Sequence, residues 1–422
     1  MIESRYYYPR SYYRRRQRRL GQRLMALLLL PLVATGCYPA IGEDIGTSCR
    51  QRSLQASNAV SELSLPQQQR GNPLLVPTWI TYQQRFVMSD GRVVDREDRD
   101  RTVSEGQAYT MLRAAMINDR PTFERALAWA EANLARPGDS LWAWHWGQAE
   151  TGEWRILDDN FATDADIDAV TALILAARRW NCPAYMDLAK TKLNDIWTLG
   201  TAGVSTDQRH LLPGPAEAFW QNGNTLILNP SYFAPYSFKL FAQVDSRHDW
   251  LSLVDTGYQF LDDSTAASAA GLPSDWIQLD LQTGEFLPVP DESALETRYS
   301  FDAFRVWWRV ALDAAWFNEP RAEAFLSNNL AHLQQRWRND SAIPASLSLD
   351  GEALVDYEAT VQYAMLYPAF QLTSPLLARE IYLQKLLPAY EQGFWDNNRA
   401  YYAQNLAWFG LLPLEQPGDL LQ

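Results

Sequence analysis

The sequence predicts an all-α fold, an (α/α)6 barrel of six helical hairpins, on the strength of three observations. Apolar residues recur about every 3.6 positions from Leu74 onward. Several turns between successive helices are very short, as at 118–120, which forces antiparallel neighbours. Three polar and aromatic segments, 136–162, 198–230 and 264–299, are too long to be simple connectors. A closed ring of hairpins would gather these loops at one open end. An open helical array is the alternative, although no motif repeats at a fixed period.

Twelve helix-sized stretches make up this prediction. In chain order they are 76–88, 105–117, 121–134, 164–180, 183–197, 231–243, 246–263, 300–316, 319–336, 353–371, 374–390 and 399–411. Ser104 and Thr163 stand where an N-cap would precede the second and fourth stretches. Asp119 and the pair Asn318-Glu319 open the third and ninth stretches, each shortly before a proline.

Residues 1–36 are expected to be an export signal and not part of the fold. Eight Arg are followed by an apolar run from Leu24 to Ala34 and then by Thr35-Gly36-Cys37. The segment 33–37 resembles a bacterial lipobox, which makes Cys37 the predicted lipidation site. Ordinary signal cleavage and an uncleaved anchor are the alternatives. All three place the body outside the cytoplasm, as a membrane-anchored lipoprotein of the periplasm or cell surface or as a secreted protein.

Residues 37–73 are predicted to be a flexible tether, and residues 74–422 the folded domain. The tether is rich in Ser, Gln, Asn and Pro and has no sustained apolar period. Cys49 lies within it, whereas Cys182 lies beside Pro183 at a helix boundary. A disulfide between the two is permitted in an oxidising compartment, but we expect two unpaired thiols.

The charge and composition exclude several classes of function. From Cys37 onward the chain has 29 basic and 49 acidic residues, which argues against binding nucleic acid or an anionic polymer. Only four His are present, and neither Cys49 nor Cys182 has metal-ligating neighbours, so we expect no metal and no cofactor. The chain has 17 Trp, 20 Tyr and 16 Phe, more rings than a core requires. Such a composition favours a cleft for ring-shaped ligands.

Carboxylates stand at the beginnings of three predicted helices. Glu105 follows Ser104, Asp164 and Asp168 share one helix face while Asp166 points elsewhere, and Asp302 precedes Arg305 by three residues. Each has an ordinary explanation, since acids stabilise the first turn of a helix and an Asp–Arg pair can be an intrahelical salt bridge. Their common position, next to long aromatic loops, favours convergence at one end of a barrel.

The aromatic loops supply the second half of a candidate site. Sugar rings stack their C–H faces on aromatic planes, and their hydroxyl groups need polar partners nearby. Some of these rings must belong to the core, because Trp at alternate positions is also typical of a strand with one packed face. The ring-bearing segments are Trp142-Ala143-Trp144-His145-Trp146-Gly147, Phe219-Trp220, Pro230-Ser231-Tyr232-Phe233 and Asp275-Trp276.

With these motifs in this order, the sequence resembles glycoside hydrolase family 8, the bacterial endoglucanase family, over roughly residues 76–410. The segments that carry the resemblance are Tyr82-Gln83-Gln84-Arg85-Phe86, Asp90-Gly91-Arg92-Val93, Ser104-Glu105-Gly106-Gln107, Trp144-His145-Trp146-Gly147, Ala162-Thr163-Asp164-Ala165-Asp166, Asn229-Pro230-Ser231-Tyr232, Gly271-Leu272-Pro273-Ser274-Asp275-Trp276 and Tyr299-Ser300-Phe301-Asp302-Ala303-Phe304-Arg305-Val306. Departures from the family pattern are Ala108 and Thr110 after Gln107, His145 in place of Arg, and Ser274 before Asp275. None of them removes a catalytic carboxylate.

The resemblance implies an (α/α)6 barrel and three catalytic residues. Glu105 matches the proton donor, Asp302 the general base, and Asp164 the residue that holds the distorted sugar. Members of the family invert the configuration at the anomeric carbon. Because the attacking water needs room, we expect the Glu105 and Asp302 carboxyl groups to lie roughly 6.5–9.5 Å apart. Glu105 should have a pKa raised by burial or by a nearby carboxylate, while Asp302 stays ionised. The expected substrate-binding residues are Trp144, Trp220, Tyr232, Trp276, Tyr299 and Arg305.

We therefore expect an exported inverting endo-β-1,4-glucanase that acts on cellulose or a related β-glucan. Its partners would be this polysaccharide, a membrane through the N-terminal anchor only, and, as a further hypothesis, the machinery that makes or exports a polysaccharide. Chitosan, mixed-linkage glucan and xylan are alternative substrates within the family. A lipoprotein that binds glycans without cleaving them is the alternative from another class.

Overall fold

The computed structural model describes residues 72–204, 208–290, 293–415 and 417–421. The predicted export signal, the predicted lipidation site Cys37 and nearly all of the predicted tether, Cys49 included, lie outside these residues. Within the described part, no helix is long and apolar enough to cross a membrane.

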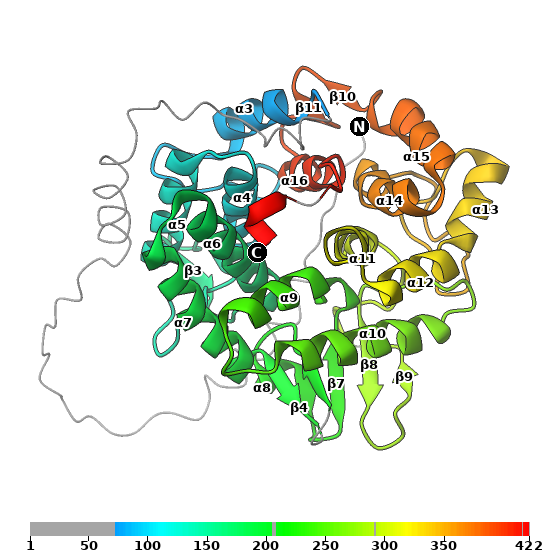
Figure 1. Ribbon diagram of the computed structural model, residues 1–422, viewed down its shortest axis with the longest axis horizontal. Coiled ribbons are helices and arrows are strands. Elements are labelled where there is room, and N and C mark those ends of the chain that lie inside the picture. Colours follow the sequence, from blue (N-terminus) through cyan, green and yellow to red (C-terminus); the bar gives the residue numbers. More distant parts are fainter. Residues whose placement is uncertain (1–71, 205–207, 291–292, 416, 422) are drawn as a thin grey trace, which may run out of the picture.

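Six helices form a closed inner ring. Each packs against the next one along the chain, and the last packs against the first (Figure 1). They are α4 (Ser104–Met116), α6 (Thr163–Trp180), α9 (Pro235–Val244), α11 (Phe304–Phe317), α14 (Thr360–Thr373) and α16 (Tyr401–Gly410).

An outer helix packs against each inner one. Five outer helices directly follow their inner partners along the chain: α5 (Arg120–Asn133), α7 (Pro183–Leu199), α10 (Trp250–Ala266), α12 (Pro320–Asn329) and α15 (Pro375–Ile381). The sixth, α3 (Leu75–Phe86), packs against α16, so the first described helix completes the last hairpin. The prediction of an (α/α)6 barrel of six hairpins is thereby confirmed.

Several predicted stretches differ in detail. The stretch 319–336 is divided between α12 and α13 (Ala331–Asp340), and 374–390 consists of α15 followed by the π-helical turn η3 (Tyr382–Leu386). The stretch 231–243 begins with the 3-10 turn η2 (Pro230–Tyr232), and α9 starts only at Pro235, where the missing N–H of proline costs no helical hydrogen bond.

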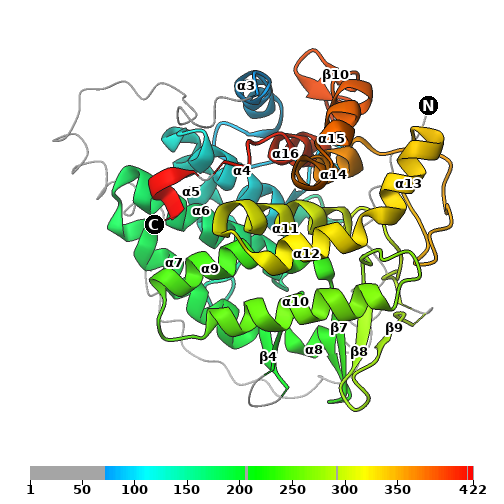
Figure 2. The same cartoon turned by 45° about the vertical axis from the view of Figure 1, so that its right-hand side comes forward.

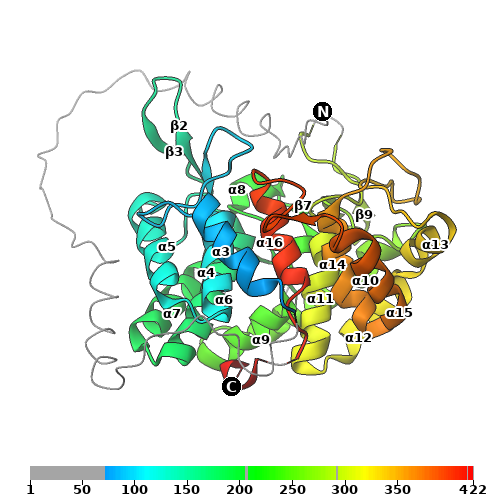
Figure 3. The ribbon, with the colours of Figure 1, turned by 90° about the horizontal axis from the view of Figure 1, so that it is seen from above.

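The three long loops carry short antiparallel strands. One sheet joins β1 (Thr102–Val103), β2 (His145–Gln148) and β3 (Trp154–Asp158), and its β2–β3 hairpin stands clear of the barrel at the end opposite the C-terminus (Figure 3). A second sheet has the order β6 (Trp220–Gln221), β7 (Thr225–Leu228), β8 (Ile277–Asp280) and β9 (Phe286–Leu287), and lies beside α10 together with α8 (Ala216–Phe219), as Figure 2 shows. The remaining short elements are β4 (Thr201–Gly203), β5 (Arg209–Leu211), β10 (Tyr390–Glu391), β11 (Phe394–Trp395) and η4 (Gly418–Leu421).

The helix caps differ between the two rings. Asp119 and Glu319 accept backbone N–H groups at the starts of α5 and α12, as predicted. The predicted caps Ser104 and Thr163 are wrong: each is the first residue of its helix, and the Thr163 hydroxyl donates instead to the carbonyl of Leu212. None of the six inner helices has a side-chain cap from the residue that precedes it.

Cys182 corrects the prediction of two unpaired thiols. Its side chain is buried at the start of α7 and is disulfide-bonded, to a partner outside the described residues. The expectation rested on neighbours along the chain, which carry no information about a partner that the fold brings close. The bond lies at the α6–α7 turn, at the end of the barrel opposite the first turns of the inner helices.

Candidate active site

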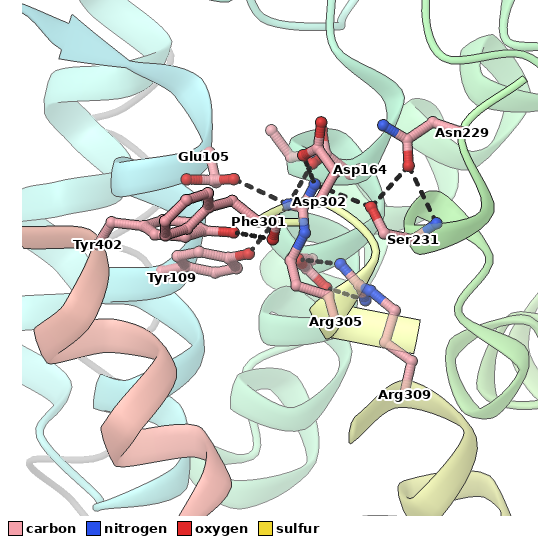
Figure 4. A network of polar contacts seen from close by, with 12 residues as sticks. Glu105, Tyr109, Asp164, Asn229, Ser231, Phe301, Asp302, Arg305, Arg309 and Tyr402 are labelled. Carbon is pink, nitrogen blue, oxygen red and sulfur yellow. Dashed lines mark hydrogen bonds and ion pairs between the residues drawn. The ribbon is translucent and has the colours of Figure 1, made fainter. Parts of the chain in front are cut away.

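Arg305 connects the three predicted catalytic carboxylates. Its Nη1 atom donates to Glu105 Oε2 at 2.9 Å and to Asp164 Oδ2 at 2.8 Å. Its Nη2 atom donates to Asp302 Oδ1 at 2.7 Å and to the Ser231 hydroxyl at 2.9 Å (Figure 4). Since Arg305 is fully buried, these charge-assisted bonds are little screened by water. The structure thus brings together residues that lie up to 200 positions apart in the sequence.

The elements that carry these groups begin at the same end of the barrel. Glu105 and Asp164 are the second residues of α4 and α6, and Asp302 lies in the turn before α11. Ser231 belongs to η2, immediately before α9. The positive ends of four inner-helix dipoles therefore point toward a cluster of carboxylates, which stabilises negative charge there.

Glu105 is buried, with 4% of its surface exposed. Burial raises its pKa from 4.5 to about 8, while Arg305 opposes this change and Asp164 adds to it. The hydroxyl of Tyr401, the first residue of α16, donates to Glu105 Oε1 at 3.3 Å. The raised pKa favours the protonated form of the Glu105 carboxyl near neutral pH, which is the direction expected from the sequence.

Asp302 is more accessible than Glu105, since 22% of its side chain is exposed. Burial raises its pKa above the ordinary value, and Arg305 together with Trp276 opposes that rise. The two carboxyl groups contact different nitrogens of one guanidinium. The predicted separation of 6.5–9.5 Å between them stays a prediction.

An open pocket of about 1070 Å³, including solvent space at its mouth, lies on the Asp302 side of this cluster. Asp302 and Trp276 form part of its wall, together with Tyr401 and Tyr402 from the start of α16. Glu105 does not line it directly, but Tyr401 contacts both the pocket and the Glu105 carboxylate. The other lining residues are Asp95, Glu97, Arg101, Asp275, Ala294, Leu295, Glu296, Arg298, Ser300, Phe301, Ser346, Val355 and Tyr357.

A second buried ion pair lies one helical turn below the first. Arg309 donates to both carboxylate oxygens of Asp168, at 2.9 and 2.8 Å, and to the Tyr236 hydroxyl at 3.2 Å. Asp166 points away from this cluster and accepts the backbone N–H of Trp142, as its position in the helix predicts. Arg309 therefore neutralises Asp168 and leaves Arg305 to the three carboxylates above.

The predicted aromatic residues divide into two groups. Trp276 lines the pocket, and the Tyr232 ring lies 6.1 Å from it, with the Arg305 guanidinium 5.5 Å from the Tyr232 centroid. Trp144 and Trp220 are half-buried against the hydrophobic core and do not line this pocket. Tyr299 is fully buried, and its hydroxyl accepts the indole N–H of Trp307. This geometry gives Tyr299 a packing role in place of the expected contact with substrate.

Sequence reasoning missed several residues of the site. Tyr401 and Tyr402 stand at the start of the predicted stretch 399–411, the position that Glu105 and Asp164 occupy in their own helices, and this shared position was the available signal. Tyr109 accepts from Arg305 at 3.3 Å and lies one turn after Glu105. Ser231 belongs to the motif 229–232, and nothing in that motif indicates its hydrogen bond with Arg305.

The polar groups of the cluster form a network of ion pairs. Among the described residues, no group of three or more His, Cys, Asp or Glu side chains is arranged to hold a metal ion. At the centre of the cluster, a guanidinium stands between the three carboxylates.

Comparisons with known proteins agree with this architecture. Residues 51–412 match the model of the glycosyl hydrolases family 8. An endoglucanase of Xanthomonas axonopodis pv. citri is 31% identical over 350 residues, which cover 78% of this chain and 87% of the relative. An endoglucanase of Escherichia coli K12 is 31% identical over 239 residues, or 56% of this chain and 62% of that protein. The crystal structure of the endo-1,4-D-glucanase from Vibrio fischeri ES114 has a TM-score of 0.68 at 26% identity and covers 79% of this chain and 93% of its own. The chain belongs to glycosyl hydrolase family 8.

Proposed function

We propose that the protein is an inverting endo-β-1,4-glucanase in which Glu105 is the general acid and Asp302 the general base. The observation that carries this proposal is the contrast between the two carboxyl groups on one guanidinium. Glu105 is buried and has a pKa of about 8, whereas Asp302 is partly exposed and lines the open pocket. Two carboxyl groups in different environments are what acid and base catalysis at one bond requires.

In the proposed reaction, Glu105 donates its proton to the glycosidic oxygen as the bond to the anomeric carbon breaks. Asp302 accepts a proton from a water molecule that attacks the anomeric carbon from the opposite face, which inverts its configuration. Bond cleavage leaves Glu105 ionised and Asp302 protonated, and exchange of one proton with solvent at each group restores the starting state. Because Arg305 contacts both, its charge stabilises whichever of them is ionised. Asp164, on the same guanidinium nitrogen as Glu105, would hold the distorted sugar at the cleavage point.

The charge of the pocket wall is compatible with a neutral glucan as substrate and does not single out a cationic polymer. Acidic lining residues outnumber basic ones, which by itself would attract chitosan. However, Arg101 pairs with Asp95 at 3.1 Å, and Arg298 pairs with Glu296 at 2.5 Å. Burial also raises the pKa of Asp275 well above the ordinary value, which favours its neutral form. Asp302 in turn pairs with Arg305, so the excess of negative charge is smaller than the residue count suggests.

We also propose that the protein works outside the cytoplasm, attached to a membrane through Cys37, on a polysaccharide that the cell exports. The disulfide of Cys182 supports an oxidising compartment. Labelling of cells with a fatty-acid analogue tests the anchor: wild-type protein should incorporate it, and a Cys37→Ser variant should not. Equal labelling of both proteins contradicts the proposal.

The activity is tested by release of reducing ends from carboxymethylcellulose, mixed-linkage glucan, xylan and chitosan, each with the wild-type protein and Glu105→Gln. We expect release from carboxymethylcellulose that is lost in the variant. Release from xylan or chitosan alone would change the assigned substrate. Binding without release from any of the four would favour a glycan-binding protein.

A further inference from the structure

The turn that carries Asp302 is held by a carboxylate from another part of the chain. Asp275 Oδ1 accepts the backbone N–H of Ser300 at 3.2 Å and that of Ala303 at 2.8 Å. These two residues flank Phe301 and Asp302. The backbone N–H of Asp275 also donates to the carbonyl of Arg298 at 2.6 Å. The two segments are therefore joined on both sides of the base.

This contact holds the turn before the helix and not the helix itself. The first N–H groups of α11, those of Phe304, Arg305 and Val306, donate to the carbonyl oxygens of Ser300, Asp302 and Ala303, so the turn 300–303 supplies the acceptors that the start of α11 needs. Asp275 supplies an acceptor to this turn from the loop between α10 and β8, and only 7% of the residue is exposed, so water does not compete effectively.

The neighbouring residue acts on Asp302 directly. Trp276 lies close enough to Asp302 to lower the pKa of its carboxyl, and both side chains line the open pocket. Asp275 thus fixes the backbone of the turn, while Arg305 fixes the carboxylate itself. A base that must take a proton from a bound water depends on such alignment, since an error of about 1 Å can cost about 100-fold in rate.

We propose that Asp275 is a positioning residue for the reaction: it holds the turn 300–303 and thereby directs Asp302 toward the attacking water. The inference rests on the proposed function, because it assumes that Asp302 is the base. The hydrogen bonds require an acceptor oxygen at Oδ1 and no charge, so an amide serves as well as a carboxylate. Burial and the nearby Asp302 raise the pKa of Asp275 well above the ordinary value, which agrees with a neutral group in this role.

Two variants of the full chain separate the hydrogen bonds from the charge. Asp275→Asn keeps the acceptor, and its kcat on cellohexaose should stay within about twofold of wild type. Asp275→Ala removes the acceptor, and its kcat should fall by roughly 10- to 100-fold. The Kd for cellohexaose, measured by calorimetry, should change less than about threefold in both. If Asp275→Ala does not fold, Asp275→Ser, whose oxygen falls short of both N–H groups, takes its place in the comparison with Asp275→Asn.

Asp119→Ala is the matched control. Asp119 is as buried as Asp275, at 7% exposure, and its carboxylate also accepts a backbone N–H, that of Thr122, but it lies at the start of the outer helix α5. Its loss should lower the melting temperature and leave kcat unchanged. An equal loss of kcat in Asp119→Ala and Asp275→Ala would assign both effects to general destabilisation and overturn the inference.

A double-mutant cycle with Asp302→Asn tests whether Asp275 acts through Asp302. The Asp275→Ala change should not lower the residual rate of Asp302→Asn further. A strongly reduced rate of Asp302→Asn that falls further by the full factor of Asp275→Ala would overturn the inference and leave the proposed function intact. Full activity of Asp302→Asn would overturn both. Wild-type kcat in Asp275→Ala, or equal losses in Asp275→Ala and Asp275→Asn, would overturn the inference alone.

Discussion

Replacing Glu105 by Gln should change the stability of the protein in a pH-dependent way. The free energy of unfolding of the variant, relative to that of wild type, should increase as the pH rises from acidic to alkaline. The folded-state pKa of Glu105 is about 8, against an ordinary value of 4.5. The folded protein therefore keeps a proton that the unfolded chain releases. The resulting stabilisation is fully present below pH 4.5 and is lost as the pH rises through 8. Gln has the same shape and does not titrate, so this loss is absent from the variant.

The size of the effect follows from the shift. Each pKa unit corresponds to about 1.4 kcal/mol, which gives about 4 to 5 kcal/mol for Glu105 between pH 4.5 and pH 8. The variant also loses its charge interaction with Arg305, which changes its stability by an additional amount. The informative quantity is therefore how the difference in free energy of unfolding between the variant and wild type changes with pH.

Urea unfolding of both proteins at pH 5 and pH 8.5, with the disulfide of Cys182 kept oxidised, measures this change. The free energy of unfolding of Glu105→Gln minus that of wild type should increase by about 4 kcal/mol from pH 5 to pH 8.5. A difference that stays constant within about 1 kcal/mol would mean that Glu105 is ionised in the folded protein throughout. Such a group has no proton to donate, and its assignment as the general acid would be refuted.

Three other predictions concern the surroundings of the carboxylates and the disulfide. Arg305→Lys keeps one positive charge but cannot contact both Glu105 and Asp302. The value of kcat/KM should therefore fall at least about tenfold, and the acid limb of its pH profile should move to higher pH. An unchanged profile would contradict the role of Arg305. Trp276→Phe removes the polar N–H of the indole, and with it an influence that lowers the pKa of the Asp302 carboxyl, so the acid limb of the kcat profile should move to higher pH by about one unit; a move to lower pH would contradict this influence. Cys182→Ser should lower the free energy of unfolding by about 2 to 4 kcal/mol in urea without changing kcat, and equal stability would mean that the disulfide constrains the chain little.

Much of the fold could be predicted because it depends on local patterns. The 3.6-residue period and the short turns locate the helices, and a turn as short as 118–120 fixes which helices are neighbours. Helix starts were less predictable. Ser and Thr are common N-cap residues, but strand β1 leads directly into α4, so Ser104 is already helical. The Thr163 hydroxyl donates to a carbonyl that is distant in the sequence. Tertiary contacts outweigh local propensity at both positions.

The carboxylates of the candidate site could be predicted from the sequence, but most of the hydrogen bonds that join them could not. The i, i+3 spacing of Asp302 and Arg305 indicates their contact, and the structure contains it. The contacts of Arg305 with Glu105 and Asp164 join helices far apart in the sequence, so no spacing reveals them. Aromatic residues were hardest to assign: Trp142 is fully buried and belongs to the core, although it stands in the same motif as Trp144.

The most direct test of the inverting mechanism is the anomeric form of the product released from cellohexaose, measured by proton NMR in the first minutes of the reaction. Attack by water activated at Asp302, opposite the proton donated by Glu105, predicts that the α-anomer appears first and that the β-anomer forms only by later mutarotation. Glu105→Gln should release neither. Initial release of the β-anomer by the wild-type protein would contradict the proposed mechanism.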